Sequence, residues 1–372
     1  MKEKQSDSLV YEYWFAGIRA LSTRKKRKLR EELGNAENIY YIEETKLRSF
    51  DFLTEKDIVA INSERKNKEI KKEYDICLEK GIVFVPFFHP QYPRRLRKIV
   101  SPPYALYVKG NLPDDDKLSA AIVGARQCTP YGEQMAISFA EMLAENGVQI
   151  ISGMAKGIDG AGQRGALNVG GKSYGVLGCG IDICYPREHI GLYSDLQKSG
   201  GILSEQPTGT PPLKEFFPAR NRIISGLSDI VLVMEAKEKS GSLITADMAL
   251  EQGKDVYALP GPITSNYSRG CNELIRQGAG ILVSPEELME ELGVSCNSFP
   301  VKMDGNSGKN EKMLERAENL VYSKLDLYPK SLSRLLDETK MAPAELMQQL
   351  TSLIIKGYIE EISKNYYVRS KL

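Results

Sequence analysis

Short apolar runs alternate with amphipathic stretches through the middle of the chain. Between residues 120 and 235 the runs read AAIVG, VQIISG, SYGVLG, GILSE and DIVLVMEA, and each ends in glycine or a polar residue. Apolar runs of this length, closed by turn residues and separated by helical patterns of about ten to fifteen residues, are typical of parallel strands joined by crossover helices. The alternation continues through DVYALPG, GCNELIRQGA, GILVS and PEELMEELG, so we expect six or seven strands between residues 117 and 293. The predicted fold class is α/β, with an extended Rossmann-like parallel sheet.

The flanking segments have different patterns. Residues 1–75 mix charged and apolar positions at helical spacing and predict a helical N-terminal domain. The segment 76–116 contains a strand pattern, GIVFVPFF, and a proline-rich run with Tyr104 and Tyr107, which we interpret as a preface to the sheet in one domain of residues 76–293. The polar segment 294–310 predicts a linker, and residues 311–372 predict three helices and two strands, the order of a winged-helix domain.

The third helix of that last domain bears on its function. From Ala342 to Ile355 it contains no Lys or Arg, and it carries Glu345. Phosphate-neutralising side chains supply most of the affinity for duplex DNA. We therefore favour a protein contact or a structural role over duplex reading.

Composition limits the classes of protein. The chain has 372 residues, 42% hydrophobic and 27% charged, which is typical of globular protein with two or three domains. No apolar run approaches the roughly twenty residues that span a bilayer, and the start of the chain has no secretory apolar core, so we expect a cytoplasmic protein. Six scattered cysteines and two histidines show no metal-ligand spacing, and we expect reduced thiols without a metal.

A net charge of +1 excludes bulk basic charge as evidence for nucleic-acid binding, so a polyanion site must be a local group of cations. The basic cluster from Arg24 to Arg30 is interpreted as a solvated helix face.

Local groups of cations follow the predicted strands. In GARQCTPYG, Gly124 closes a strand and Arg126 projects from the turn before a helix start, where free N–H groups and a guanidinium both suit a phosphate. SGMAKGIDG repeats the arrangement with Lys156 and Gly157, and its Asp159 is interpreted as orienting a lysine or capping a helix, although a metal or a ribose hydroxyl stays an alternative.

The later loops add aromatic and hydroxyl groups. Cations interleaved with Phe and Asn are typical of single-stranded nucleic-acid sites, where bases stack on rings and cations follow the backbone. Four or five such loops along one sheet edge fit a strand with several phosphates better than one nucleotide. The candidate residues in these loops are Arg187, Lys214, Phe217, Arg220, Asn221, Arg222, Lys239, Ser240, Gly241 and Ser242.

Two segments resemble nucleotide-binding motifs but do not match them. The segment 166–173, ALNVGGKS, has Ala166 where a P-loop needs its first glycine, and it leads from a helix into a strand. GCGIDI at Gly178 lacks the third glycine of a dinucleotide fingerprint. His89 and His189 do not lie near a nucleophile elbow, so a Ser/His/Asp triad is not favoured.

The motifs GARQCTPYG, SGMAKGIDGAGQRGAL, GCGIDICYP, SEQPTGTPPLKEFFPARNRIISGLS, SGSLITADMALEQGKDVYALPG and GCNELIRQGA occur in one order. In them the chain resembles the DNA-processing protein A family, also called DprA or Smf. The resemblance implies a Rossmann-like domain that binds single-stranded DNA, forms a homodimer and loads the RecA recombinase onto that DNA in transformation or recombination. It also implies DNA contacts at Arg126, Arg187, Lys214, Phe217, Arg220, Asn221 and Arg222. Gln163 and His89 depart from the usual family pattern.

Two alternatives from other classes stay open. Related Rossmann-like enzymes, the nucleoside-monophosphate phosphoribohydrolases, need a PGGxGT loop, and this chain reads PGPITSN at residues 260–266. A duplex-DNA regulator working through the winged helix is opposed by the uncharged third helix. We therefore expect a protein that binds DNA without catalysis and without a cofactor.

Overall fold

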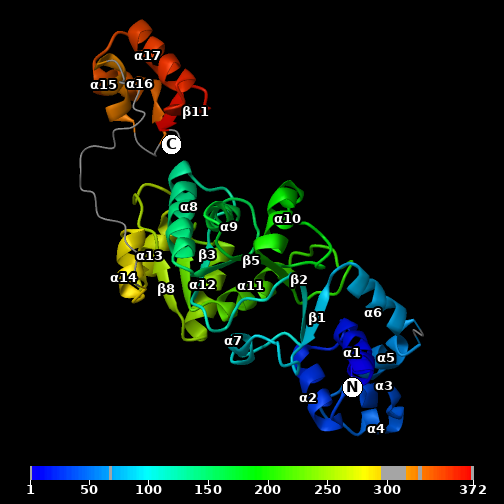
Figure 1. The fold of residues 1–372 in the computed structure, drawn as a ribbon. Coiled ribbons are helices and arrows are strands. Elements are labelled where there is room, and N and C mark those ends of the chain that lie inside the picture. Colours follow the sequence, from blue (N-terminus) through cyan, green and yellow to red (C-terminus); the bar gives the residue numbers. More distant parts are fainter. Residues whose placement is uncertain (1, 67–68, 295–315, 326–328, 370–372) are drawn as a thin grey trace. The chain divides into compact units, whose positions relative to one another are not determined.

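The computed structural model describes residues 2–66, 69–294, 316–325 and 329–369 (Figure 1). Within them, nine strands form one sheet with the order β1-β2-β6-β5-β4-β3-β7-β8-β9. The strands are β1 (Val83–Pro86), β2 (Ala105–Gly110), β3 (Ser119–Val123), β4 (Gln149–Ser152), β5 (Ser173–Leu177), β6 (Gly200–Ser204), β7 (Ile230–Val233), β8 (Asp255–Ala258) and β9 (Gly280–Ile281).

The seven strands from β3 to β9 pair in parallel, which confirms the predicted α/β class and the predicted number of strands. Every position of β3, β4, β5, β6 and β7 is buried, as expected for parallel strands covered on both faces. The strand order reverses between β3 and β7. In sheets of this kind ligands bind at the carboxyl ends of the strands beside such a reversal.

Crossover helices connect these strands. The helices of this part are α8 (Pro130–Glu145), α9 (Ile158–Asn168), α10 (Ile190–Ser199), α11 (Phe216–Leu227), α12 (Gly241–Glu251), α13 (Arg269–Arg276) and α14 (Pro285–Glu291), with the short turn η1 (Arg187–His189) before α10. The segment 166–173 leads from the end of α9 into β5, which confirms that it runs from helix to strand, the reverse of a P-loop.

The preface adds two strands that the sequence pattern only partly predicts. β2 pairs antiparallel with β6, and β1 pairs antiparallel with β2, with the short helix α7 (Arg94–Arg97) between them in the chain. The preface is therefore part of the sheet itself. Its strands extend the β6 side of the sheet toward the N-terminal helices.

Six helices precede β1, as predicted from their helical pattern: α1 (Lys2–Gly17), α2 (Thr23–Leu33), α3 (Ala36–Tyr41), α4 (Glu44–Arg48), α5 (Glu55–Glu64) and α6 (Ile70–Glu79). Their core is continuous with that of the sheet, because Phe15 and Trp14 belong to the same buried cluster as Tyr107 and Ile202. The predicted boundary after residue 75 falls inside α6. One compact unit comprises residues 1–127 and 136–294, and the rest of the domain division stays a prediction.

The basic cluster at α2 is not a solvated face, so that interpretation is wrong for most of its members. Lys25 pairs with Asp57 at 2.5 Å, and the buried Lys26 donates to the carbonyl of Ala16. Arg30 pairs with the buried Glu12, and three further contacts place cations over rings: Arg27 over Phe87, Lys28 over Phe52 and Arg30 over Phe88. Most of these cations therefore contact other parts of the protein.

The second unit comprises residues 128–135 and 295–372, of which the C-terminal part contains α15 (Arg316–Lys324), β10 (Lys330–Ser331), α16 (Leu332–Thr339), α17 (Pro343–Ile355), β11 (Ile359–Ser363) and β12 (Tyr366–Arg369). The strands form a small sheet with the order β10-β12-β11. Asn365 has a φ of 64° in the turn predicted between the last two strands. Three helices and a small sheet are the elements of a winged helix, and that identification stays a prediction. The linker predicted over 294–310 lies outside the described residues except for Val294.

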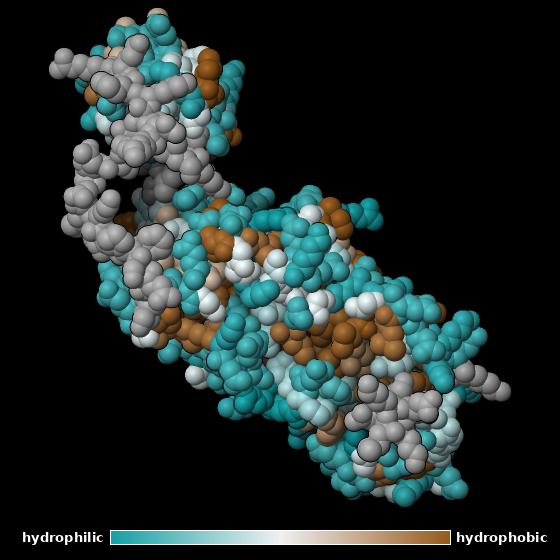
Figure 2. Space-filling model, in the orientation of Figure 1, coloured by the Kyte–Doolittle hydropathy of each residue, from teal (hydrophilic) through white to brown (hydrophobic). Residues whose placement is uncertain are grey.

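Five cysteines lie in the described residues and are free thiols; Cys77, Cys179 and Cys271 are buried. The face drawn in Figure 2 is mainly hydrophilic, with apolar residues in separate patches. Among the described helices, none combines the length and apolarity that a membrane crossing requires.

Candidate nucleic-acid interface

The loops that follow the parallel strands lie along one edge of the sheet, which we call the carboxyl edge. From one side to the other, the strands that end there are β6, β5, β4, β3, β7, β8 and the short β9. Across the first six, five spacings of about 4.8 Å between neighbouring strands make an edge on the order of 24 Å long. Helices α9, α11 and α12 begin after these loops, so their N-terminal ends lie at the same edge.

At the centre of this edge an arginine and two aromatic rings form a group that we call the aromatic–arginine cluster. The guanidinium of Arg126, in the loop after β3, lies 5.5 Å from the ring centroid of Phe217 at the start of α11. The ring of Tyr185 lies 5.5 Å from that of Phe217, tilted by 41°. Arg126 and Tyr185 are exposed and Phe217 is half-buried. A charge for a phosphate and a surface for a base are therefore side by side.

The ring of Phe217 packs against Gly178, where there is no side chain to keep it away from the backbone. A Cβ at Gly178, in the loop after β5, would lie 2.9 Å from the Phe217 ring. The ring thus packs directly on the backbone of that loop. One side of the ring is fixed by the fold, and Arg126 and Tyr185 extend its surface toward solvent.

Two glycines expected to give backbone access to an anion also have packing reasons. A Cβ at Gly124 would lie 2.7 Å from the side chain of Ile158, at the start of α9. Gly157 has a φ of 73°, and a Cβ there would lie 2.4 Å from the carbonyl oxygen of Ala125. The N–H of Ile158 also donates to the Ala125 carbonyl at 3.2 Å. These contacts fix the loop that carries Arg126 against the start of α9.

Arg220 is an interior residue, 5% exposed, and its guanidinium donates to the carbonyls of Gly153 and Val176. The buried carboxylate of Asp159 accepts from the N–H of Gly153, and a Cβ at Gly153 would be 2.6 Å from both charged groups. Burial lowers the pKa of Arg220 to about 10 and raises the pKa of Asp159, while each charge offsets part of the shift of the other. Asp159 therefore lies beside an arginine, in place of the lysine, metal or ribose considered from the sequence.

Asn221 and Arg222 also have internal partners. The Asn221 amide donates to the carbonyl of Gly241 and accepts from Arg220, so it connects α11 to the start of α12. Arg222 forms a two-bond ion pair with Glu205, at 2.7 and 2.5 Å, and its Nε donates to the carbonyl of Ser101. In this conformation the three consecutive polar residues of the PARNR motif direct their polar groups into the protein. Their expected DNA contacts stay untested.

The start of α12 keeps the expected arrangement of hydroxyls. Ser240 caps the helix by accepting from the N–H of Ser242, and the two hydroxyls are 2.8 Å apart. Gly241 is exposed, with open space where a Cβ would stand. Lys239 beside them is exposed and has no partner among the described residues. This terminus offers hydroxyls, the exposed backbone of Gly241 and a cation to the same ligand.

The other predicted cations are exposed, with differing partners. Lys156 pairs with Glu188 at 2.6 Å, a surface contact that a phosphate could replace at little cost. Arg187 and Lys214 have no side-chain partner in the described part of the chain. The edge therefore brings together Arg126, Lys156, Arg187, Lys214, Phe217 and Lys239 as accessible groups and turns Arg220, Asn221 and Arg222 inward.

Two features of the edge were missed in the sequence. Tyr185 extends the aromatic surface, and the ammonium of Lys237 lies 4.6 Å from the ring centroid of Tyr267, giving a second cation–aromatic pair. An exposed aromatic next to proline in the CYPRE segment was the available signal for Tyr185. No signal in the sequence was available for Tyr267. Its loop follows β8, and only the strand order brings that loop beside the loop after β7.

No group of metal-ligating side chains occurs among the described residues. Gln163, which departs from the family pattern, is buried and donates to the carbonyl of Tyr174 at 3.1 Å. Its amide thus supports β5 from α9.

Comparison with known proteins gives one family. A model described as DNA recombination-mediator protein A matches residues 83–293. Protein Smf of Escherichia coli is 48% identical over 210 residues, which span 56% of this chain and 56% of that protein, so the chain covers little more than half of this relative's length. Protein Smf of Synechocystis is 35% identical over 287 residues, 76% of this chain and 72% of the relative.

Two solved structures share the fold. DNA processing protein A from Streptococcus pneumoniae superposes with a TM-score of 0.65 at 32% identity, over 76% of this chain and 97% of that one. The protein of the same name from Helicobacter pylori has a TM-score of 0.52 at 33% identity, over 57% of this chain and 95% of that one, and its structure is described as showing a single-stranded DNA binding mode.

Proposed function

Because the chain belongs to the DNA recombination-mediator protein A family, we propose that it binds single-stranded DNA along the carboxyl edge of its sheet. Its relatives are named as DNA processing proteins, and the description of the Helicobacter pylori structure concerns single-stranded DNA. The observation in this chain that carries the proposal is the aromatic–arginine cluster. Rings for unpaired bases and a guanidinium for the backbone are exposed together there.

The proposed path follows the strand order. Lys214 and Arg187 stand on the β6 and β5 side of the cluster, and Lys237 and Lys239 stand on the β7 side. A backbone running along an edge on the order of 24 Å would meet cations before, at and after the cluster. Paired bases in a duplex have no free face to stack on Phe217, so this arrangement favours a single strand.

We propose that Arg220, Asn221 and Arg222 position the edge and do not touch the DNA. The support is their internal bonding to the carbonyl of Gly153, the carbonyl of Gly241 and the carboxylate of Glu205. They keep α11, which carries Phe217, against the loops after β4 and β6. The accessible cations along the path then carry the phosphate contacts: Arg126, Arg187, Lys214, Lys237 and Lys239.

We further propose that the chain mediates recombination by loading the RecA recombinase onto the bound strand, as a homodimer through its sheet unit and in the cytoplasm. The description of its family as recombination mediators supports the first part. We propose no catalytic step, since residues 260–266 read PGPITSN where a phosphoribohydrolase loop would read PGGxGT, and Asp159, an acid beside the edge, is buried against Arg220.

The test is a titration of the purified chain with single-stranded and duplex DNA of equal length at two salt concentrations. We expect tighter binding of the single strand, with affinity that falls as salt rises. Phe217→Ala should weaken single-strand binding by about 1–3 kcal/mol. Tyr41→Ala is the matched control, because Tyr41 is an exposed aromatic of α3, in the N-terminal helical part. Equal affinity for the duplex, or no loss in Phe217→Ala, would contradict the proposal.

A further inference from the structure

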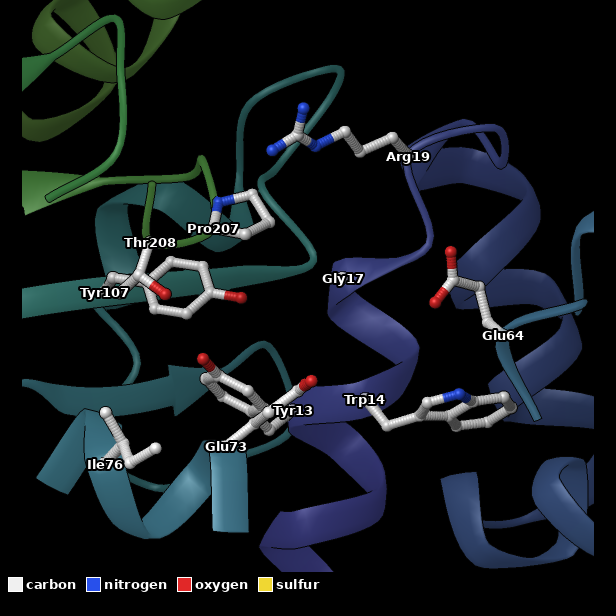
Figure 3. A pocket seen from close by; sticks show the side chains of 10 residues that line it. All are labelled: Tyr13, Trp14, Gly17, Arg19, Glu64, Glu73, Ile76, Tyr107, Pro207 and Thr208. Atoms are coloured by element: carbon white, nitrogen blue, oxygen red, sulfur yellow. The ribbon is translucent and has the colours of Figure 1, made fainter. Parts of the chain in front are cut away.

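Aromatic rings at the carboxyl edge differ from those of the interior in whether a ligand can reach them. Tyr13, Trp14 and Tyr107 line a pocket of about 360 Å³ between α1 and β2 (Figure 3), and all three are buried in one core cluster. Packed in this way, they offer a strand no free face. Tyr267, in the loop after β8, is a different case, because it is half-buried and the exposed Lys237 lies over its face.

The loop that carries Tyr267 is fixed against the loop after β7. The N–H of Ala236 donates to the carbonyl of Tyr267 at 2.8 Å, and the N–H of Gly270 donates to the carbonyl of Ala236 at 2.8 Å. A Cβ at Gly270 would lie 2.8 Å from that same carbonyl oxygen, so this close approach requires glycine. Within the loop, the amide of Asn272 donates to the carbonyl of Gly261 at 2.9 Å and accepts from its N–H at 3.2 Å. The ring is therefore preorganised at this end of the edge.

The charges beside the ring suit a polyanion. The ammonium of Lys237 lies 4.6 Å from the ring centroid of Tyr267. The acid of the same loop, Glu238, pairs with Arg269 at 3.3 Å. Lys237 and Lys239 are exposed, and neither has a carboxylate partner in the described ranges. A ring for a base and a cation for the backbone thus recur here, as at the aromatic–arginine cluster.

We propose that Tyr267 and Lys237 form a second base-stacking subsite for the single strand, at the β7 and β8 end of the carboxyl edge. This inference rests on the proposed function, since it concerns another part of the same strand. An unpaired base stacks on the ring face that Lys237 covers, and the ammonium moves to the adjoining phosphate. Stacking on an aromatic ring contributes more than an exposed cation–π contact, and the ammonium gains an ionic partner, so the exchange is favourable.

The strand order sets the distance between the two subsites. The aromatic–arginine cluster lies between the loops after β5 and β3, and Tyr267 follows β8, so two to four strand spacings separate them. At about 4.8 Å per spacing, the distance along the edge is on the order of 10–19 Å. A stacked strand advances about 3.4 Å per nucleotide, so about three to six nucleotides separate the two bases. A trinucleotide can therefore occupy one subsite only, whereas a dodecamer can occupy both.

Strand length therefore separates the two subsites in a binding experiment. Oligothymidines of three and twelve nucleotides are titrated at low salt into the wild type and into Tyr267→Leu, which removes the ring and keeps apolar bulk. We expect both proteins to bind the trinucleotide alike. The variant should bind the dodecamer roughly five- to 150-fold more weakly than the wild type does, the worth of one stacked base. Tyr267→Phe is the matched control, because it keeps the ring, and it should bind both strands as the wild type does.

Lys237→Gln gives a second readout that a purely structural ring would not change. If the ammonium meets a phosphate, the variant should lose about 0.7 of the logarithmic salt slope for the dodecamer. Tyr267→Leu should keep the wild-type slope, because stacking releases no counterions. An unchanged slope in Lys237→Gln would overturn the paired arrangement of ring and cation.

The remaining outcomes distinguish this subsite from the proposed function. Wild-type binding of the dodecamer by Tyr267→Leu, with weakened binding of both strands by Phe217→Ala, overturns the second subsite and spares the proposed function. Equal losses at both lengths in Tyr267→Leu, or the same loss in Tyr267→Phe, would show that the side chain serves the fold and would also overturn the subsite. A dodecamer loss in Tyr267→Leu with none in Phe217→Ala would contradict the aromatic–arginine cluster and leave the second subsite standing.

Discussion

Arg126 and Arg220 lie at the same edge of the sheet with opposite surroundings. The guanidinium of Arg126 is exposed and lies 5.5 Å from the ring centroid of Phe217, whereas that of Arg220 is buried between two carbonyls near Asp159. Removing one member of a buried pair of charges leaves the other without compensation. The same substitution at the two positions should therefore affect different properties.

Arg220→Ala should lower the free energy of unfolding by about 3–5 kcal/mol, because the buried carboxylate of Asp159 loses its neighbouring cation. Arg126→Ala should change it by less than about 0.5 kcal/mol. Urea unfolding of both variants beside the wild type measures the difference. Equal midpoints for Arg220→Ala and the wild type would mean that Arg220 is not a positioning residue.

Lys26 predicts a pH dependence. Burial lowers its pKa from 10.5 to about 7, so between these values the unfolded chain binds a proton that the folded chain does not. Stability in this window should rise with pH, by at most about 1.4 kcal/mol per pH unit from this group. Lys26→Met should be more stable than the wild type at pH 7, and its advantage should shrink as the pH approaches 10.5. Unfolding at several pH values checks this, and a pH-independent difference would contradict it.

At this scale the sequence identified the residue types but not their partners. The PARNR motif supplies two arginines and an asparagine. The motif alone does not predict that Arg220 donates to the carbonyl of Gly153 or that Arg222 pairs with Glu205. Those partners come from other loops, and only the strand order brings them near. Likewise the sequence does not show that Lys25 and Arg30 are paired, because Asp57 and Glu12 are distant from them in the chain.

At the scale of elements, the strands from β3 to β7 were predictable because each is a buried apolar run with turn residues at its end. The antiparallel pairing of β2 with β6 was not, since periodicity gives the existence of a strand and not its neighbour. Gly157 shows how a loop joins two elements. Its positive φ and its approach to Ala125 set the loop after β3 against the start of α9.

Gly157→Ala should destabilise the fold by more than Gly253→Ala. Both residues have positive φ, which costs an alanine about 1–2 kcal/mol, but only at Gly157 would the Cβ also strike a backbone oxygen, at 2.4 Å. Displacing that loop moves Arg126, so Gly157→Ala should also weaken single-strand binding while Gly253→Ala leaves it intact. Thermal unfolding and a binding titration check the pair, and identical losses at the two glycines would refute this reading of the loop.

At the scale of the whole molecule, the N-terminal helices share a core with the sheet, which the sequence pattern did not show. The sequence pattern predicts Phe15 as an apolar position of a helix and Tyr107 as part of an extended run. That the two side chains share one buried cluster is shown only by the structure. The same juxtaposition creates the pocket around Trp14. The central claim, a single strand held by a cation and a ring at the carboxyl edge, concerns this unit alone.

The most direct test of that claim compares the salt dependence of single-strand binding in Arg126→Ala and Phe217→Ala. Each neutralised phosphate contributes about 0.7 to the logarithmic salt slope for single strands, so Arg126→Ala should lose affinity and about that much slope. Phe217→Ala should lose about 1–3 kcal/mol with the slope unchanged, because stacking releases no counterions. Arg276→Ala, an exposed arginine in the last turn of α13, is the control and should match the wild type. A folded Arg126→Ala protein with unchanged affinity and slope would contradict the account.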